Sequence, residues 1–243
     1  MKILVVGDSC IDIFIYGEID RISPEAPVPV FKPMRKTENG GMAKNVVANL
    51  EALGCKVHLV SNTNGIEKVR YVDERSNQMV MRVDDHDWCN RIDQNELISF
   101  DGYDAIIISD YCKGFLNEDD IQYICEEYNN VFIDTKKQLG DWVKNAKFIK
   151  INDLEHKKNF EVIPNYPELE DKLIVTQGKN GCIFKDKIFS TQEVPVKDVS
   201  GAGDTFLAGL VFDYVKSNDI ASAITFAQEC TTKVVQKHGV STV

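Results

Sequence analysis

The sharpest chemical pattern in the sequence is the run Asp198-Val-Ser-Gly-Ala-Gly-Asp204-Thr205, which leads into an apolar helical segment. Gly201, Ala202 and Gly203 leave their backbone N–H groups free to face an anion at the start of a helix, where the helix dipole adds positive charge. A carboxylate beside such donors can take a proton from a hydroxyl while the donors hold a phosphoryl group. The pattern predicts phosphoryl transfer with Asp204 as the base. The alternative is a glycine-rich turn with a capping aspartate.

Two further segments offer groups that suit a sugar. Gly40 and Gly41 precede a helical stretch and permit close backbone approach, and Asn45 offers a donor and an acceptor to a polyol. The first predicted strand ends at Gly7-Asp8, and Asp12 follows four residues later. Carboxylates just past the carboxyl end of a parallel strand lie where such sheets bind ligands. The alternatives are a simple turn for the glycines and a solvated loop for the carboxylates.

A fourth segment, Asn152-Asp-Leu-Glu155, directly follows a predicted strand. Asn152 and Glu155 at a strand-to-helix turn can reach phosphate or a magnesium-bound water, so we expect them to serve the metal indirectly. A helix-capping box, with Asn as the cap and Glu three residues later, fits the same spacing almost as well.

Short apolar runs alternate with amphipathic stretches along the chain and must position these groups. Near-continuous apolar runs are typical of parallel strands buried on both faces, and the alternation predicts a doubly wound α/β sandwich. The predicted strands are 3–6, 57–60, 105–108, 131–133, 148–151 and 173–175, and the predicted helices are 43–53, 118–127, 202–216 and 221–237.

Two segments break this alternation. Asp12–Pro33 carries a Pro-Glu-Ala-Pro-Val-Pro-Val stretch that does not suit a central strand, and Val69–Val83 has period-two character around a polar turn. We expect a single domain over residues 1–243, with a small β lid built from about 12–35 and 68–84.

The composition restricts the class of protein. The chain has 28 basic and 38 acidic residues, a formal net charge of −10, which disfavours binding to nucleic acid. Seven dispersed cysteines without a CxxC pair predict reduced thiols in the cytoplasm, and the four histidines show no zinc-ligand spacing. No apolar stretch approaches a membrane span or a signal peptide, so we expect no membrane association.

The four motifs occur together and in order, and in this the chain resembles the ribokinase-like (PfkB) carbohydrate kinases. In that family a GGxxxN segment marks the sugar site, here Gly40, Gly41 and Asn45. A DTxGAGD segment marks the catalytic site, here with Val199 in place of the usual Thr, and an NxxE element serves magnesium and phosphate. The resemblance implies a fold of a mostly parallel sheet between helices, ATP and Mg²⁺ as cofactors, and Asp8 and Asp12 on the sugar. It also implies a nucleotide site to which Lys136, Gly178, Gly181 and Asp198 contribute.

Within this family the chain is similar to the kinase half of the bifunctional heptose-7-phosphate kinase/adenylyltransferases of lipopolysaccharide core synthesis. The runs 21–30 (Arg-Ile-Ser-Pro-Glu-Ala-Pro-Val-Pro-Val) and 109–114 (Ser-Asp-Tyr-Cys-Lys-Gly) carry this likeness. It implies phosphorylation of heptose 7-phosphate to heptose 1,7-bisphosphate. Basic groups must then meet the substrate phosphate, and the candidates are Lys113, Arg82, Arg70 and Lys136.

Three departures from the relatives bear on this interpretation. The sequence ends where that kinase domain ends, so only a kinase activity is expected. The segment after Val60 is short, and Lys44 stands where relatives have a small residue. Related kinases pair such lids, so we expect a homodimer through the lid. The alternatives are a kinase for another sugar or a nucleoside, and a non-catalytic sugar- or nucleotide-binding relative.

Overall fold

The main sheet carries the chain's largest layer and has eight strands in the order β12-β11-β10-β9-β8-β7-β1-β4. The structure is a computed structural model and describes residues 1–93, 100, 102–237 and 239–243. Six neighbouring strands run parallel, and β11 and β12 pair antiparallel at one edge. The strands are β1 Lys2–Gly7, β4 Lys56–Ser61, β7 Ala105–Asp110, β8 Val131–Thr135, β9 Phe148–Asn152, β10 Leu173–Thr176, β11 Cys182–Phe184 and β12 Lys187–Phe189.

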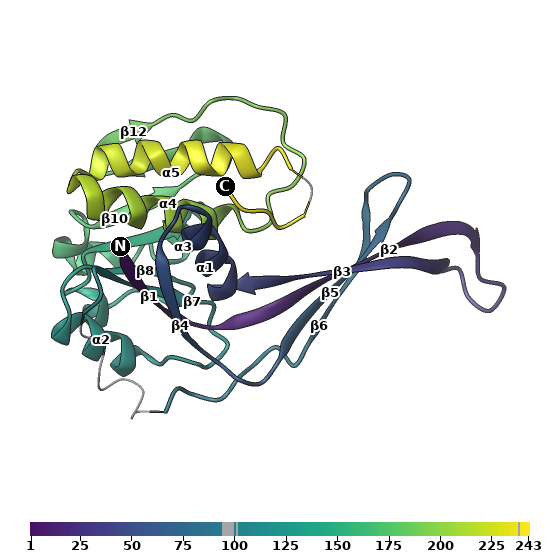
Figure 1. Cartoon of the computed structure of the whole chain (residues 1–243), viewed down its shortest axis with the longest axis horizontal. Coiled ribbons are helices and arrows are strands. Elements are labelled where there is room, and N and C mark those ends of the chain that lie inside the picture. The colour runs from purple at the N-terminus through teal and green to yellow at the C-terminus, as the bar shows by residue number, and fades with distance from the viewer. Residues whose placement is uncertain (94–99, 101, 238) are drawn as a thin grey trace.

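Helices cover both faces of this sheet, which is why its central strands contain near-continuous apolar runs. Ile3 and Val5 of β1 pack into the core under α1, α4 and α5, whereas Leu4 and Val6 pack into the core that contains α2. Figure 1 shows α4 and α5 along one side of the sheet and α2 on the other. The helices are α1 Ala43–Ala52, α2 Glu118–Glu127, α3 Asp153–Lys158, α4 Ala202–Ser217 and α5 Ile220–Val234, with 3-10 turns at Asp141–Val143, Ile163–Asn165, Pro167–Leu169 and Gly178–Asn180.

The predicted α/β sandwich and all six predicted strands are confirmed. The helix predicted over 118–127 is also present, and Asn117 caps it with a side chain that accepts from Asp120 N–H. The largest difference in a helix boundary is at the end of α5, which lies at Val234 rather than Lys237. The carbonyl of Val235 instead accepts from Lys197 N–H and Asp198 N–H, which joins the end of α5 to the loop before α4.

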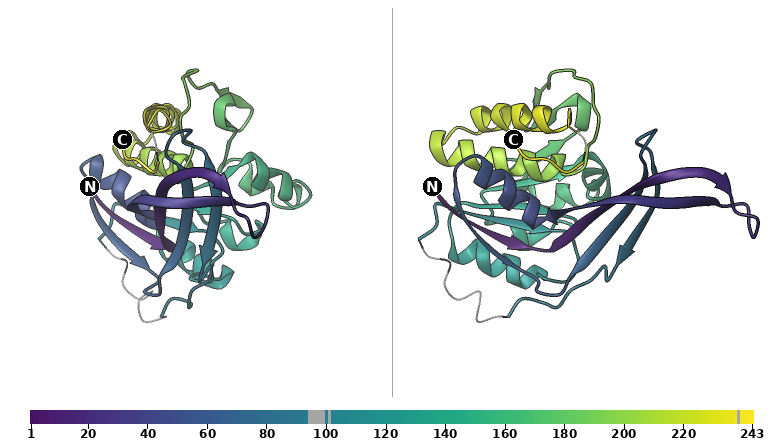
Figure 2. Two further views of the ribbon diagram at one scale, coloured as in Figure 1. Left: turned by 90° about the vertical axis from the view of Figure 1, so that its right-hand side faces the viewer. Right: turned by 45° about the vertical axis from the view of Figure 1, so that its right-hand side comes forward.

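A second sheet, here called the small sheet, has four strands in the order β3-β2-β5-β6. Its strands are β2 Ser9–Ile22, β3 Pro29–Met42, β5 Ile66–Asp73 and β6 Met79–Asp85. The hairpins β2–β3 and β5–β6 are each antiparallel, and parallel pairing of β2 with β5 joins them. Pro29 and Pro33 lie in β3 at the edge, where a missing N–H is tolerated. The small sheet projects from one side of the molecule in Figure 1 and in the right view of Figure 2, and it points toward the viewer in the left view of Figure 2.

The link from the main sheet to β5 is short, as β4 ends at Ser61 and β5 begins at Ile66. Asn62 fastens this link, since its Oδ1 accepts from Ser9 N–H at 2.7 Å and its Nδ2 donates to Ser9 O at 3.1 Å. The start of β2 and the start of β5 are therefore held together directly. Across the described ranges, none of the helices has both the length and the apolar character that crossing a bilayer requires.

Candidate active site

Asp204 lies in the first turn of α4 with its side chain buried, 3% exposed. Its Oδ1 accepts a hydrogen bond from the Tyr111 hydroxyl at 2.6 Å, and its Oδ2 accepts from Asn45 Nδ2 at 2.9 Å. Three segments far apart in the sequence thus meet at one carboxylate, which is held in a single orientation.

Burial raises the pKa of Asp204 to about 6, and nearby Asp134 acts in the same direction. The hydrogen bonds from Tyr111 and Asn45, together with the charge of Lys150, act to lower it. The result is a carboxylate that is ionised at neutral pH yet binds a proton more tightly than an exposed aspartate. That is the balance a general base requires.

The glycines before Asp204 have separate roles. Gly201 has a left-handed φ of 76° and leaves room for Asn45, whose Nδ2 would lie 2.3 Å from an added Cβ. Gly203 leaves room for Lys150, whose Nζ would lie 2.9 Å from a Cβ there. Lys150 is thereby brought against the first turn of α4, and the sequence did not reveal it.

The predicted anion-binding donors are present only in part. The Ser200 N–H donates to Asp198 Oδ1 at 2.8 Å, and the Ala202 N–H donates to the Val199 carbonyl at 3.2 Å. The N–H groups of Gly201 and Gly203 donate to no residue within the described ranges. These two donors, at the positive end of the α4 dipole, are the ones available to an anion.

Four charged side chains form a largely buried cluster behind this turn. Lys150 Nζ pairs with Asp134 Oδ2 at 2.7 Å, and Lys136 pairs with Glu155 and lies 3.8 Å from Asp134 Oδ1. Although burial acts to lower the pKa of Lys136, Asp134 and Glu155 raise it overall. Lys136 and Lys150 thus each have a carboxylate partner.

The predicted metal pair Asn152 and Glu155 forms a complete capping box at the start of α3. Glu155 Oε2 accepts from Asn152 N–H at 2.7 Å, and Asn152 Oδ1 accepts from Glu155 N–H at 2.9 Å. The described residues contain no group of three His, Cys, Asp or Glu side chains that would hold a metal by themselves. Asp134 Oδ1 is buried and accepts no hydrogen bond from the described residues, so it is the oxygen in this cluster that fits a further donor.

A cavity of about 250 Å³ opens beside Asp204 between the main body and the small sheet. One wall comes from α1, the loop after β7 and the start of α4, and the other comes from the small sheet. The lining residues are Cys10, Asp12, Met42, Asn45, Lys68, Arg70, Arg82, Tyr111, Ser200, Gly201, Asp204 and Val240.

Asp12 lines this cavity, but its carboxylate already has a partner. Arg70 NH1 donates to Asp12 Oδ1 at 2.5 Å. Gly41 packs against the same carboxylate, since a Cβ on Gly41 would lie 2.1 Å from Asp12 Oδ2, whereas Gly40 packs against Lys44. The two glycines end β3 opposite Cys10 and Ile11 rather than forming a turn.

Asp8 and Lys113 do not line this cavity. The Asp8 carboxylate accepts from the N–H groups of Tyr111 at 2.6 Å, Phe115 at 3.2 Å and Lys113 at 3.3 Å. It therefore organises the loop that carries Tyr111, and burial, followed by the charge of Asp110, raises its pKa. The Lys113 ammonium pairs with Asp87 Oδ2 at 2.5 Å.

Three residues expected at the nucleotide, Asp198, Gly181 and Gly178, do not line the Asp204 cavity. Asp198 holds the loop before α4, as its Oδ2 accepts from Gly239 N–H at 3.0 Å. Gly181 lies against Gln228, which lines a polar cavity of about 420 Å³ between residues 190–192 and α5. A Cβ on Gly178 would meet no atom within 4 Å.

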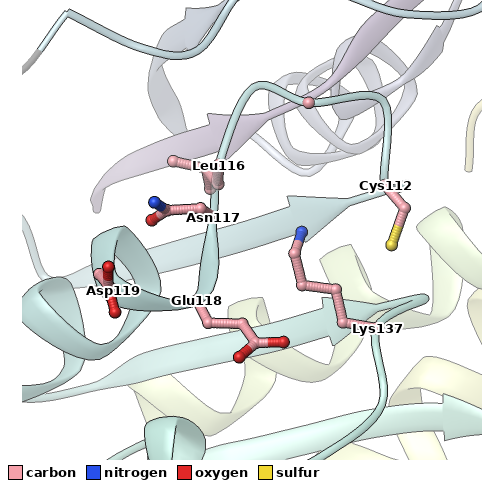
Figure 3. A pocket seen from close by; sticks show the side chains of 7 residues that line it. Cys112, Leu116, Asn117, Glu118, Asp119 and Lys137 are labelled. Atoms are coloured by element: carbon pink, nitrogen blue, oxygen red, sulfur yellow. The ribbon is translucent and has the colours of Figure 1, made fainter.

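Figure 3 shows another cavity, of about 450 Å³, between the loop after β7 and the start of α2. Lys137 extends into it from the end of β8, and Cys112 and Glu118 line it. Lys137 Nζ is already held by both carboxylate oxygens of Asp110 at 2.7 Å. Asp204 does not line this cavity, so the candidate base cannot act there.

The sequence did not indicate four residues of the site, which are Tyr111, Lys150, Asp134 and Lys68. Tyr111 lies inside the run 109–114 that had already been singled out, so a signal for it was present. The other three follow or interrupt apolar strand runs, and only the packing of strands β5, β8 and β9 around Asp204 reveals them.

Comparison with known proteins identifies the family of the chain. The model of the pfkB family of carbohydrate kinases matches residues 67–243. Two curated relatives named bifunctional protein HldE, one from a Nitratiruptor species and one from Campylobacter curvus, are each 32% identical to this chain. The alignments cover 99% and 100% of this chain but 63% of each relative.

Solved structures share the fold. A ribokinase from Thermotoga maritima superposes with a TM-score of 0.71 at 18% identity, covering 98% of this chain and 94% of that one. The Arabidopsis thaliana ribokinase complexed with ribose and ATP gives 0.66 at 14% identity, with coverage of 98% and 93%. Because the family model matches most of the residues and the fold agrees, the chain belongs to the pfkB family of carbohydrate kinases, which confirms the family and enzyme class predicted from its sequence.

Proposed function

We propose that the chain transfers the γ-phosphoryl group of ATP to a hydroxyl of a sugar bound in the Asp204 cavity. The observation that carries this proposal is the state of Asp204. It is a buried carboxylate with a pKa of about 6, held by Tyr111 and Asn45, at a glycine-rich helix start. A carboxylate so placed is a proton acceptor, and the turn before it can receive a phosphoryl group.

In this mechanism the sugar hydroxyl gives its proton to Asp204 while its oxygen attacks the γ-phosphorus in line. The new bond joins that oxygen to phosphorus, the bond to the β–γ bridging oxygen breaks, and ADP leaves with the bonding electrons. The free N–H groups of Gly201 and Gly203 would donate to the transferring group, and the buried Lys150 ammonium behind the turn would add positive charge that stabilises it.

Magnesium bound with ATP would neutralise phosphate charge, and it usually keeps several waters and takes few protein ligands. Asp134 and Glu155 would hold the magnesium ion through such waters. Asp134 Oδ1 accepts no hydrogen bond from the described residues, and Lys136, which lies near Asp134, also pairs with Glu155. The polar cavity beside Gln228 is our candidate for the adenosine end of the nucleotide.

We propose heptose 7-phosphate as the acceptor, with heptose 1,7-bisphosphate as the product. Support comes from the likeness of residues 21–30 and 109–114 to heptose kinases and from a cavity wall that carries Lys68, Arg70 and Arg82. A cationic wall in a chain of net charge −10 favours a phosphorylated sugar over a neutral sugar or nucleoside.

We further propose that the small sheet closes over the sugar as a lid within a single domain, and that two copies pair through it in the cytoplasm. Apolar side chains on β6 support the pairing, since Met79 is 57% exposed and Met81 is 52% exposed. Contiguous exposed apolar side chains of this kind mark interaction surfaces.

The decisive experiment is an ADP-release screen with Mg-ATP against heptose 7-phosphate, hexose phosphates, free sugars and nucleosides. We expect turnover with heptose 7-phosphate above all others. Turnover with another acceptor would replace the substrate but keep the reaction. Absence of ADP release with every acceptor, in protein that binds sugar, would instead support a non-catalytic binding protein.

A further inference from the structure

Three cationic side chains project from one face of the small sheet into the Asp204 cavity. Lys68 and Arg70 are two residues apart on β5 and so share a face. Arg82 lies on β6 directly opposite Arg70 in the strand register. Like charges placed opposite each other repel, so this arrangement needs compensating anions.

Carboxylates compensate two of the three cations. Arg70 pairs with Asp12 at 2.5 Å. Arg82 makes a two-pronged pair with Asp84, with nitrogen-to-oxygen distances of 2.6 and 2.9 Å. The guanidinium groups are therefore close to neutralised by carboxylates of the small sheet itself.

Lys68 is the cation left over. Its side chain lines the cavity and is only 9% exposed, yet Nζ makes neither a hydrogen bond nor an ion pair with any residue of the described ranges. Its contact with Tyr111 is distant, at 5.8 Å from Nζ to the ring centroid. Burial lowers the pKa of Lys68, as expected for an ammonium without a counter-ion. Keeping a charge buried and unpaired is costly unless a ligand supplies the partner.

Two carboxylates that could neutralise Lys68, Asp84 and Asp87, already have other partners. Asp84 lies opposite Lys68 in the β5–β6 register, but it is bound to Arg82. Asp87 acts on Lys68 electrostatically but pairs with Lys113 at 2.5 Å. Neither carboxylate is therefore free to serve as the counter-ion of Lys68.

The remaining carboxylates around the cavity are committed as well. Asp12, the neighbour of Lys68 in the β2–β5 register, is bound to Arg70. Across the cavity, both oxygens of Asp204 accept from Tyr111 and Asn45. Each of these carboxylates, in the part of the chain that the structure describes, thus has another donor.

We propose that Lys68 is the receptor for the phosphate ester of the acceptor sugar, with Arg70 and Arg82 as its flanking donors. This assignment rests on the proposed kinase function and names the group that selects a phosphorylated acceptor. Lys68 lies on the small sheet, opposite the α4 turn that receives the transferring phosphoryl group, so the phosphate it binds belongs to the acceptor rather than to ATP. The two negative charges of a phosphate ester suit a lysine with two nearby guanidinium groups better than the single negative charge of a sugar carboxylate does.

The test measures binding by calorimetry without nucleotide, using heptose 7-phosphate, the unphosphorylated heptose, a sugar acid and inorganic phosphate. Wild-type protein should bind the phosphorylated sugar roughly ten- to a hundredfold more tightly than the free sugar, the range expected for charge-assisted hydrogen bonds. Lys68→Met should abolish that preference and leave the free sugar unaffected. Lys36→Met, which removes an exposed small-sheet lysine paired with Glu38, is the matched control and should bind like wild type.

Thermal unfolding gives a second readout that does not depend on the sugar. Lys68→Met should unfold at a higher temperature than wild type without ligand, because an uncompensated buried charge is removed. Inorganic phosphate should stabilise wild type and the Lys36→Met control but not Lys68→Met. The assignment would be overturned if wild type bound the phosphorylated and the free sugar equally or preferred the sugar acid. It would also be overturned if Lys68→Met bound these ligands and unfolded as wild type does.

Kinetics separate this assignment from the kinase proposal. If ADP is released, Lys68→Met should raise KM for the phosphorylated acceptor and change KM for ATP less than about twofold. A rise in KM for ATP alone would place the nucleotide at Lys68 and overturn the assignment. If no acceptor releases ADP but the binding preference holds, the phosphate site stands and the kinase proposal fails.

Discussion

The hydroxyl of Tyr111 lies 2.6 Å from Oδ1 of Asp204 and donates a hydrogen bond to it. The backbone N–H of the same tyrosine donates to the carboxylate of Asp8, which follows β1. Tyr111 thereby connects the loop after β7 to the candidate base at the start of α4. The ring also faces Lys68 and Lys136, with centroid distances of 5.8 and 5.1 Å. The proposed catalytic and acceptor-binding sides of the cavity meet at Tyr111.

Asp204→Asn should leave the fold intact and lower turnover by roughly two to four decades, the scale of a lost general base. The measurement is ADP release at about pH 8 together with circular dichroism. Asp213→Asn, farther along the same helix, is the control and should retain full activity. An Asp204→Asn variant with a near-wild-type rate on the true substrate would remove Asp204 from the role of base.

The rate should depend on pH through Asp204, whose pKa is about 6. The base acts when ionised, so kcat/KM should be flat above that pH and fall about tenfold per unit below it. Folding raises the pKa of Asp204 from 3.8, so ionisation of this carboxyl opposes folding. The free energy of unfolding should therefore fall as pH rises from 3.8 to about 6, and the contribution of Asp204 should be constant above that pH. A profile of kcat/KM from about pH 5 to 9 without this acidic limb would contradict the assignment.

Tyr111→Phe should move the acidic limb of that profile to higher pH. The hydroxyl stabilises the ionised form of Asp204, and its removal should raise the apparent pKa by about one unit, the size of one hydrogen bond to a charged group. The same pH profile measures it, with Tyr123→Phe, an exposed tyrosine of α2, as the control. A lower rate with an unmoved limb would mean that Tyr111 only packs against the site.

Lys150→Met should destabilise the protein by about 3–5 kcal/mol, because it leaves the buried carboxylate of Asp134 without its partner. Urea unfolding measures the loss. Lys157→Met breaks an exposed pair with Asp153 on α3 and should cost no more than about 0.5 kcal/mol. Equal effects of the two substitutions would show that the Lys150–Asp134 pair is not a buried one in solution.

Pairing of two copies through the small sheet should appear as a homodimer in light scattering at micromolar concentration. Met81→Glu places a charge among the exposed apolar residues of β6 and should yield a monomer. Phe160→Glu, an exposed apolar residue of the main body, should remain dimeric. A fully active wild-type monomer would count against the proposed interface.

Much of the fold was determined by local sequence. The apolar runs of β1, β7 and β8 could be predicted because strands covered on both faces need apolar residues throughout. The position of Asp204 at a helix start could be predicted because glycines before an apolar helical run mark such a turn, whereas its role as a base stays a prediction.

Only the tertiary structure decided how the charges pair. Asp8, Asp12 and Lys113 are alike in sequence as polar residues after strands, yet Asp8 holds a loop, Asp12 holds Arg70 and Lys113 holds Asp87. Lys68 is one of 28 basic residues, and nothing local marks it. The parallel pairing of β2 with β5, strands distant in sequence, places Asp12 beside Lys68, but Asp12 is bound to Arg70, so Lys68 has no partner among the described residues. Electrostatic pairing depends on distance in space, and sequence order does not record it.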